Sequence, residues 1–138
     1  MGLPQAPEAR LYYRAGKQRF EDAQLLLREQ RTTGAVYLAG YTVECLLKAL
    51  VLATVSPKVR KHLLAEFRGS IAHNIEWLGT PYRRHVGAAI PRHVTLHLLR
   101  VASWSTDLRY ATGLVKSREA EEFMESVVAV ANWADGRM

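Results

Sequence analysis

The sequence predicts an all-α protein, a bundle of four or five helices, and three observations support this fold class. Apolar residues recur at three- and four-residue spacing over long stretches, which is the period of an amphipathic helix. No run alternates apolar and polar residues for more than a few positions, as a half-buried strand would. The length of 138 residues suits one compact core. We therefore expect a single helical domain over residues 1–138, with an ordered core over about residues 8–135.

The first half of the chain predicts two long helices. Residues 8–30 place apolar side chains on one side and charges on the other. "RTTG" interrupts this pattern, and Thr33 is the expected N-cap of the next helix. Residues 35–54 are apolar almost all the way round, which is typical of the centre of a bundle or of a membrane span. Because Glu44 and Lys48 lie at the middle, where charge in lipid is costly, we favour the bundle centre.

The second half is less regular. Pro57 ends the second helix, and a third long helix is expected to begin near Pro91 as "PRHVTLHLLRVASW". "STDLRYATG" indicates a connection, after which Ser117 is the expected N-cap of a final helix whose first turns are acidic. Two stretches predict a helical turn or two and a third is compatible with helix or loop: "HLLAEF", "NIEWL" and "GTPYRRHVGAAI", in that order.

Charge and cysteine content narrow the class of partner and the cellular compartment that we expect. Nineteen Lys and Arg against 13 Asp and Glu give a net charge of +6, which favours a polyanionic or acidic partner. Cys45 is the single cysteine and lies in an apolar run, so we interpret it as a buried structural thiol. The opening "MGLPQAPEAR" lacks the features of a signal peptide, and we expect a cytoplasmic protein.

Four stretches occur in an order and spacing that resemble a known family: "FEDAQLLL", "AVYLAGYTVECLLKAL", "AHNIEWL" and "WSTDLRY", followed by a last amphipathic helix. This combination resembles the HEPN domain family, named for its occurrence in higher eukaryotes and prokaryotes and for proposed nucleotide binding. The resemblance implies an up-and-down helical bundle, often a homodimer, and frequently encoded beside a minimal nucleotidyltransferase in a toxin–antitoxin-like pair. Many members are metal-independent ribonucleases, whereas others lack the catalytic motif and look like binding or scaffolding modules.

Glu44 and Lys48 belong to the first candidate site. An i, i+4 pair on an exposed helix contributes only about 0.2–0.5 kcal/mol, which does not offset the burial of two charges. Such charges need further polar partners or solvent. We therefore predict a ligand-binding pocket in which Glu44 contacts Arg109 or Tyr110, Lys48 reaches the rim and Asp107 completes the polar lining. The alternative is a mixed helix face that is exposed at one end of the bundle.

Arg92 and His97 form the second candidate site. The family's ribonucleases are recognised by an arginine followed four to six residues later by a histidine, and "RHVTLH" matches this formally. His97 would act as the base on the ribose 2′-hydroxyl and Arg92 would hold the scissile phosphate. The family motif normally opens the last long helix, where "DLRY" stands here, and no histidine follows Arg109. Arg92 and His97 would also be about 140° apart on a regular helix, so they would need a dimer partner or a helix break to converge.

A basic strip is the third candidate site. No acidic residue lies between Glu76 and Asp107, and four arginines fall in that interval: Arg83, Arg84, Arg92 and Arg100. This strip would attract a nucleotide, RNA or an acidic partner. A solvated basic face is the alternative.

These sites lead to one preferred function and one alternative. We prefer a non-catalytic binding module, possible partners being a second copy, a minimal nucleotidyltransferase, and nucleotide or RNA, with no membrane contact. The alternative is a metal-independent endoribonuclease that uses Arg92 and His97 across a dimer. His93 and His97 share a helix face but lack a third ligand, so we expect no metal and no cofactor.

Overall fold

The computed structural model describes residues 3–138, and all regular secondary structure in this range is helical. Six α-helices and two short 3₁₀ segments follow one another as α1 (Pro7–Arg28), α2 (Thr32–Thr54), α3 (Pro57–Phe67), η1 (Ser70–His73), α4 (Ile75–His85), α5 (Arg92–Val101), η2 (Thr106–Tyr110) and α6 (Ser117–Asp135). The prediction of an all-α bundle is confirmed. The predicted count of four or five helices is wrong.

The additional helices arise from two side-chain caps. The Ser56 hydroxyl accepts a hydrogen bond from the N–H of Val59 at 3.4 Å, and the Asn74 amide oxygen accepts one from the N–H of Trp77 at 2.9 Å. Each cap satisfies an N–H group that a helix start would otherwise leave without a partner. As a result α3 and α4 are eleven residues each rather than a turn or two, and α4 continues through Pro81 into the segment that the sequence left open.

Ser117 and Thr33, the two residues expected to be N-caps, do not lie at the N-cap positions of their helices. Ser117 is the first residue of α6, and Lys116 at the cap position makes no side-chain capping hydrogen bond. Thr33 lies inside the first turn of α2, where its hydroxyl donates to the Gly113 carbonyl at 2.7 Å and accepts from the N–H of Val115 at 3.0 Å. Thr33 therefore fastens the segment before α6 onto α2 instead of capping α2.

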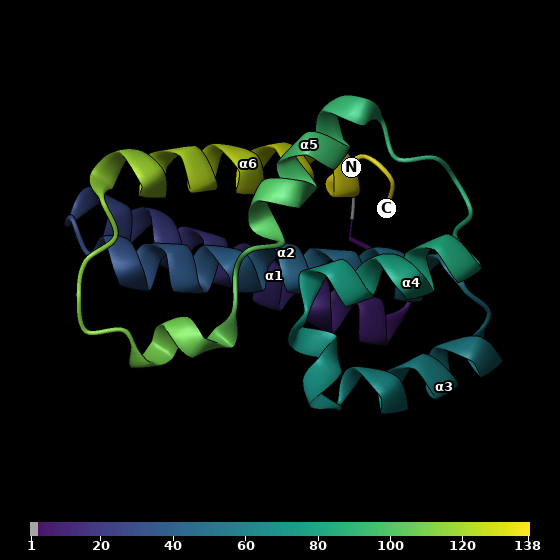
Figure 1. Ribbon diagram of the computed structural model, residues 1–138. Coiled ribbons are helices and arrows are strands. Elements are labelled where there is room, and N and C mark those ends of the chain that lie inside the picture. Colours follow the sequence, from purple (N-terminus) through teal and green to yellow (C-terminus); the bar gives the residue numbers. More distant parts are fainter. Residues whose placement is uncertain (1–2) are drawn as a thin grey trace.

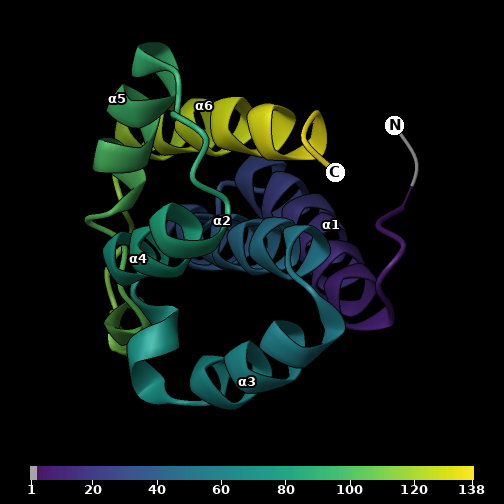
Figure 2. The ribbon, with the colours of Figure 1, turned by 90° about the vertical axis from the view of Figure 1, so that its right-hand side faces the viewer.

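The centre of the bundle is α2, which packs against α1, α4 and α6. Figure 1 shows α1 and α6 running beside α2, and Figure 2 shows α6 and α3 on opposite sides of it. By length and a hydropathy of 1.6 over its most apolar window, α2 could cross a membrane, yet 83% of that window is buried inside the protein. Among residues 3–138, α2 is thus the core helix of the bundle.

The steep crossing of α5 sets the position of η2. Val94 and Val101 of α5 are buried, while Leu96 and Leu99 are exposed. After α5 the chain descends past α6 to the side of α2, where η2 lies before the chain returns to the start of α6 (Figure 1).

Candidate functional site

A hollow lies where α2, α5, η2 and the start of α6 meet. It has a volume of about 700 Å³, and we call it the η2 groove. Its walls combine aromatic, acidic and basic side chains, among them Arg100, Trp104, Asp107, Tyr110, Glu119 and Phe123. Such a mixture of apolar surface and a few convergent polar groups is typical of small-molecule sites.

Trp104 forms the wall between the η2 groove and α2. Its indole N–H donates to the Tyr37 carbonyl at 3.1 Å, and its ring packs edge-on against Tyr41 with 5.0 Å between centroids. Gly40 makes this position of the indole ring possible, because a Cβ at residue 40 would lie 2.1 Å from the ring. The glycine is therefore needed for the close approach of an aromatic ring to the helix.

η2 itself presents Arg109 and Tyr110 to solvent. The Ser105 hydroxyl caps this 3₁₀ segment by accepting from the N–H of Asp107 at 3.1 Å. Tyr110 is 72% exposed, and the Arg109 guanidinium carbon lies 4.9 Å from the centroid of its ring. This geometry is a cation–π contact, and it places an aromatic ring and a cation side by side at the edge of the groove.

Glu44 and Lys48 lie in a different environment. The ammonium of Lys48 is 2.9 Å from one Glu44 oxygen, and Nδ1 of His73 is 3.0 Å from the other. Lys48 also lies over the rings of Tyr12 and Phe67, at 5.4 and 5.7 Å from their centroids. Glu44 and Lys48 are almost fully buried, whereas about 44% of the His73 side chain is exposed. We call Glu44, Lys48 and His73 the ion triad.

The structure does not bring the five residues of the predicted pocket together. Asp107 and Tyr110 line the η2 groove, but Glu44 and Lys48 do not. The expected contact of Glu44 with Arg109 or Tyr110 is wrong: within residues 3–138 its carboxylate pairs with Lys48 and His73 only. The alternative of an exposed mixed face is wrong as well, because both charges are buried. Ligand binding by any of the five residues stays a prediction.

Tyr41 lies between the two environments. Its ring packs edge-on against His73 at 6.2 Å and against Trp104 at 5.0 Å between centroids. Burial raises the pKa of Tyr41, and the neighbouring Tyr37 and the Glu44 carboxylate raise it further, while Arg109 acts in the opposite direction. Tyr41 thus links the ion triad to the wall of the η2 groove through direct packing.

Arg92 and His97 have different surroundings on α5. Arg92 is exposed at the start of α5, whereas His97 is half-buried and its Nδ1 is 2.9 Å from the hydroxyl of Ser126 on α6. Arg100 also donates to this hydroxyl, at 3.3 Å. Sequence reasoning missed Ser126, which is fully buried. The only signal was a lone hydroxyl on the apolar side of the last helix.

The basic strip is divided by the fold. Arg83 and Arg84 end α4 and Arg92 begins α5, so these three flank one loop, while Arg100 lies near the other end of α5 against α6. All four are exposed. The strip's role in binding stays a prediction.

No group of three or more His, Cys, Asp or Glu side chains in the described part of the chain could hold a metal ion. Cys45 is buried, and this burial, with Glu44 nearby, raises the pKa of its thiol to about 12. A thiol in this state is a poor nucleophile at neutral pH.

Comparison with known proteins gives one family. The model of the HEPN domain matches residues 9–137. No curated protein and no solved structure matches the chain. Because the match covers nearly the whole sequence and the described residues form an all-α bundle, the chain belongs to the HEPN domain family, a family of nucleotide- or RNA-related helical modules.

Proposed function

We propose that the chain is a non-catalytic HEPN-type binding module whose η2 groove holds a nucleotide. The observation that carries this proposal is the exposed Tyr110 ring with the Arg109 guanidinium 4.9 Å from its centroid, at the edge of a hollow of about 700 Å³. Small-molecule sites commonly enclose about 300–1,000 Å³, so the groove has room for a mononucleotide.

Each part of a nucleotide has a matching group. The Tyr110 ring offers a stacking surface for the base, and Arg109 and Arg100 offer charge-assisted hydrogen bonds to phosphate. The carboxylates of Asp107 and Glu119 can accept hydrogen bonds from ribose hydroxyls or from base amino groups. These acids would repel phosphate, so we infer that the phosphates lie toward Arg109 and the sugar toward Asp107 and Glu119.

Titration calorimetry with ATP and AMP tests this arrangement. Tyr110→Ala should weaken binding by about 5- to 150-fold, because stacking of one base contributes about 1–3 kcal/mol. Arg109→Gln should weaken ATP more than AMP, because it removes a phosphate contact. Arg14→Gln on α1 removes the same charge far from the groove in sequence and should bind like the wild type. An absence of saturable binding to the wild type would refute the proposal.

The proposed partners are a second copy of the chain and a minimal nucleotidyltransferase encoded beside it, in a toxin–antitoxin-like pair in the cytoplasm. Leu96 and Leu99 support an interface, because one subunit leaves 59% and 67% of these residues exposed on α5. Light scattering after size exclusion should give the mass of two chains, and co-expression should recover the nucleotidyltransferase. A monomer at micromolar concentration would contradict the homodimer.

A metal-independent endoribonuclease is the second candidate. One observation favours it: the Ser126 hydroxyl forms a hydrogen bond with Nδ1 of His97. This bond orients the ring and leaves Nε2 as the nitrogen for proton transfer. Arg92 would have to come from the second subunit. We would incubate the protein with a mixed RNA pool in a chelator, beside His97→Ala and Arg92→Gln. Cleavage by the wild type and by neither variant would establish the nuclease and reject the non-catalytic role.

A further inference from the structure

A second hollow, outside the η2 groove, lies between α3 and the end of α4. It has a volume of about 600 Å³, and we call it the α3–α4 groove. Six residues line it: Lys58, Val59, Lys61, His62, Ala65 and His85. Two are lysines, two are histidines and none is acidic, so the hollow has a single sign of charge.

The cations of this groove lack internal partners. Within residues 3–138 neither Lys58 nor Lys61 forms an ion pair, and both are exposed. Glu66, one turn further along α3, lies 3.8 Å from His62 and not within ion-pair distance of either lysine. The two ammonium groups are therefore exposed, form no ion pair within these residues and are available to an external anion.

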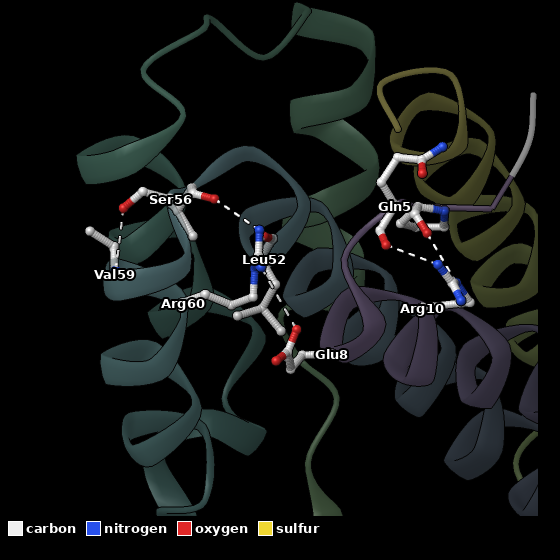
Figure 3. Close-up of polar contacts among 9 residues, drawn as sticks. Gln5, Glu8, Arg10, Leu52, Ser56, Val59 and Arg60 are labelled. Carbon is white, nitrogen blue, oxygen red and sulfur yellow. Dashed lines mark hydrogen bonds and ion pairs between the residues drawn. The ribbon is translucent and has the colours of Figure 1, made fainter.

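Arg60, between the two lysines, has internal partners for its guanidinium group. Its guanidinium donates to the carbonyls of Leu52 and Val55 at 3.1 and 3.2 Å, and it lies 3.8 Å from the Glu8 carboxylate on α1. Figure 3 shows Arg60 between the end of α2 and Glu8, with the Ser56 cap on the same turn. These contacts fix the first turn of α3 to the core. Lys58 and Lys61 consequently project from a rigid element.

The placement of Lys58 in the first turn of α3 is unfavourable for the isolated helix. The first turn of α3 contains no acidic residue, and the first turn of α5, which carries Arg92 and His93, contains none either. Cations at a helix N-terminus oppose the helix dipole, which favours anions there. Local choices that act against the fold are expected mainly at functional sites.

The α3–α4 groove continues into the basic strip. Figure 1 shows the start of α3, the end of α4 and the loop that leads to α5 on the same side of the molecule. Arg84 at the end of α4 and Arg92 at the start of α5 extend the run of cations beyond the groove. A series of cations on three successive segments matches a chain of phosphates better than one isolated phosphate.

From this arrangement we propose that the α3–α4 groove binds the phosphodiester backbone of a nucleic acid without reading its sequence. No aromatic side chain lines the groove, so nothing there would stack on bases, and lysines act as point charges toward phosphate. The proposal does not depend on the η2 groove, which shares no lining residue with this one.

Fluorescence anisotropy with labelled single-stranded and duplex RNA of mixed sequence, between 50 and 200 mM salt, tests the proposal. The variant Lys58→Gln/Lys61→Gln should reduce the slope of log K against log salt by about 1.4 for single strands, since each phosphate contact contributes about 0.7. Across that salt range its affinity should therefore change about sevenfold less than that of the wild type. The duplex arm shows which form of the backbone the groove accepts.

A matched control removes the same charge elsewhere. Arg14→Gln/Lys116→Gln changes two exposed cations outside the groove and should keep the wild-type slope. Equal losses in both double variants would show an effect of net charge only and overturn the proposal, as would an unchanged slope in the lysine variant. Equal affinity for polyglutamate would overturn it in favour of an acidic protein partner. Binding of mononucleotide should stay unchanged in the lysine variant, which separates this result from the test of the η2 groove.

Discussion

The substitution Gly40→Ala tests how closely Trp104 is packed against α2. The added methyl group would lie 2.1 Å from two atoms of the indole ring, far inside van der Waals contact. Trp104 is only 5% exposed, so the ring cannot move into solvent without unpacking from Tyr41 and releasing its hydrogen bond to Tyr37.

The expected loss follows from three contributions. Overpacking a core costs about 1–3 kcal/mol, and loss of the indole hydrogen bond at a buried site costs about 1–3 kcal/mol more. In the other direction, alanine is better than glycine inside a helix by about 1 kcal/mol. When the ring is displaced and all three contributions apply, the free energy of unfolding should fall by about 1–5 kcal/mol.

Urea unfolding followed by circular dichroism measures this loss. Gly34→Ala is a matched control in the same helix, because its Cβ would meet only the flexible end of Leu26, at 3.3 Å. It should be neutral or slightly stabilising. In a Trp104→Ala background the penalty of Gly40→Ala should disappear, since the clash has lost its partner. If Gly40→Ala unfolds at the same urea concentration as Gly34→Ala, the inferred packing of Trp104 is refuted.

Three further predictions concern buried polar groups. Glu44→Gln should lower the free energy of unfolding by about 3–5 kcal/mol, because it leaves the buried Lys48 without a counter-charge; a loss below 1 kcal/mol in urea unfolding would contradict this. Cys45, with a pKa near 12, should react with a thiol reagent at pH 8 at least about a thousandfold more slowly in the native state than in urea, and comparable rates would show that it is not buried. Ser126→Ala should cost about 1–2 kcal/mol, since it removes the partner of His97 at a fully buried position, and an unchanged thermal midpoint would argue that the bond does not form.

The long elements were predictable because their signals are local. The periodicity of α1, the apolar run of α2 and the acidic start of α6 follow from residues within one helix, and their bounds agree with the expectation to within a few residues. α4 was not predictable in full, because Pro81 lacks the N–H that continues a helix and the flanking residues are equally common in loops. The Asn74 cap at its start and the packing of Leu78 and Tyr82 into the core together make this segment helical.

The η2 groove depends on contacts between residues far apart in sequence. The approach of Trp104 to Gly40, and the bonds of Thr33 to Gly113 and Val115, join segments that only the fold brings together. No spacing in the sequence encodes these pairs. The exposed "DLRY" segment could be singled out, but the hollow beside it could not.

For the ion triad, the physical argument from the sequence was correct, but the partner that it predicted for Glu44 was wrong. A buried pair of Glu44 and Lys48 requires further polar contact, and this requirement holds for any fold. Lys48 takes one carboxylate oxygen, so the second oxygen needs another donor, and His73 supplies it because η1 ends beside the middle of α2. Since the His73 ring is partly exposed and packs against Tyr41, the charges are connected both to solvent and to the aromatic wall that Trp104 shares with the η2 groove. A change at Glu44 can therefore alter the shape of that groove through Tyr41, although Glu44 itself does not line it.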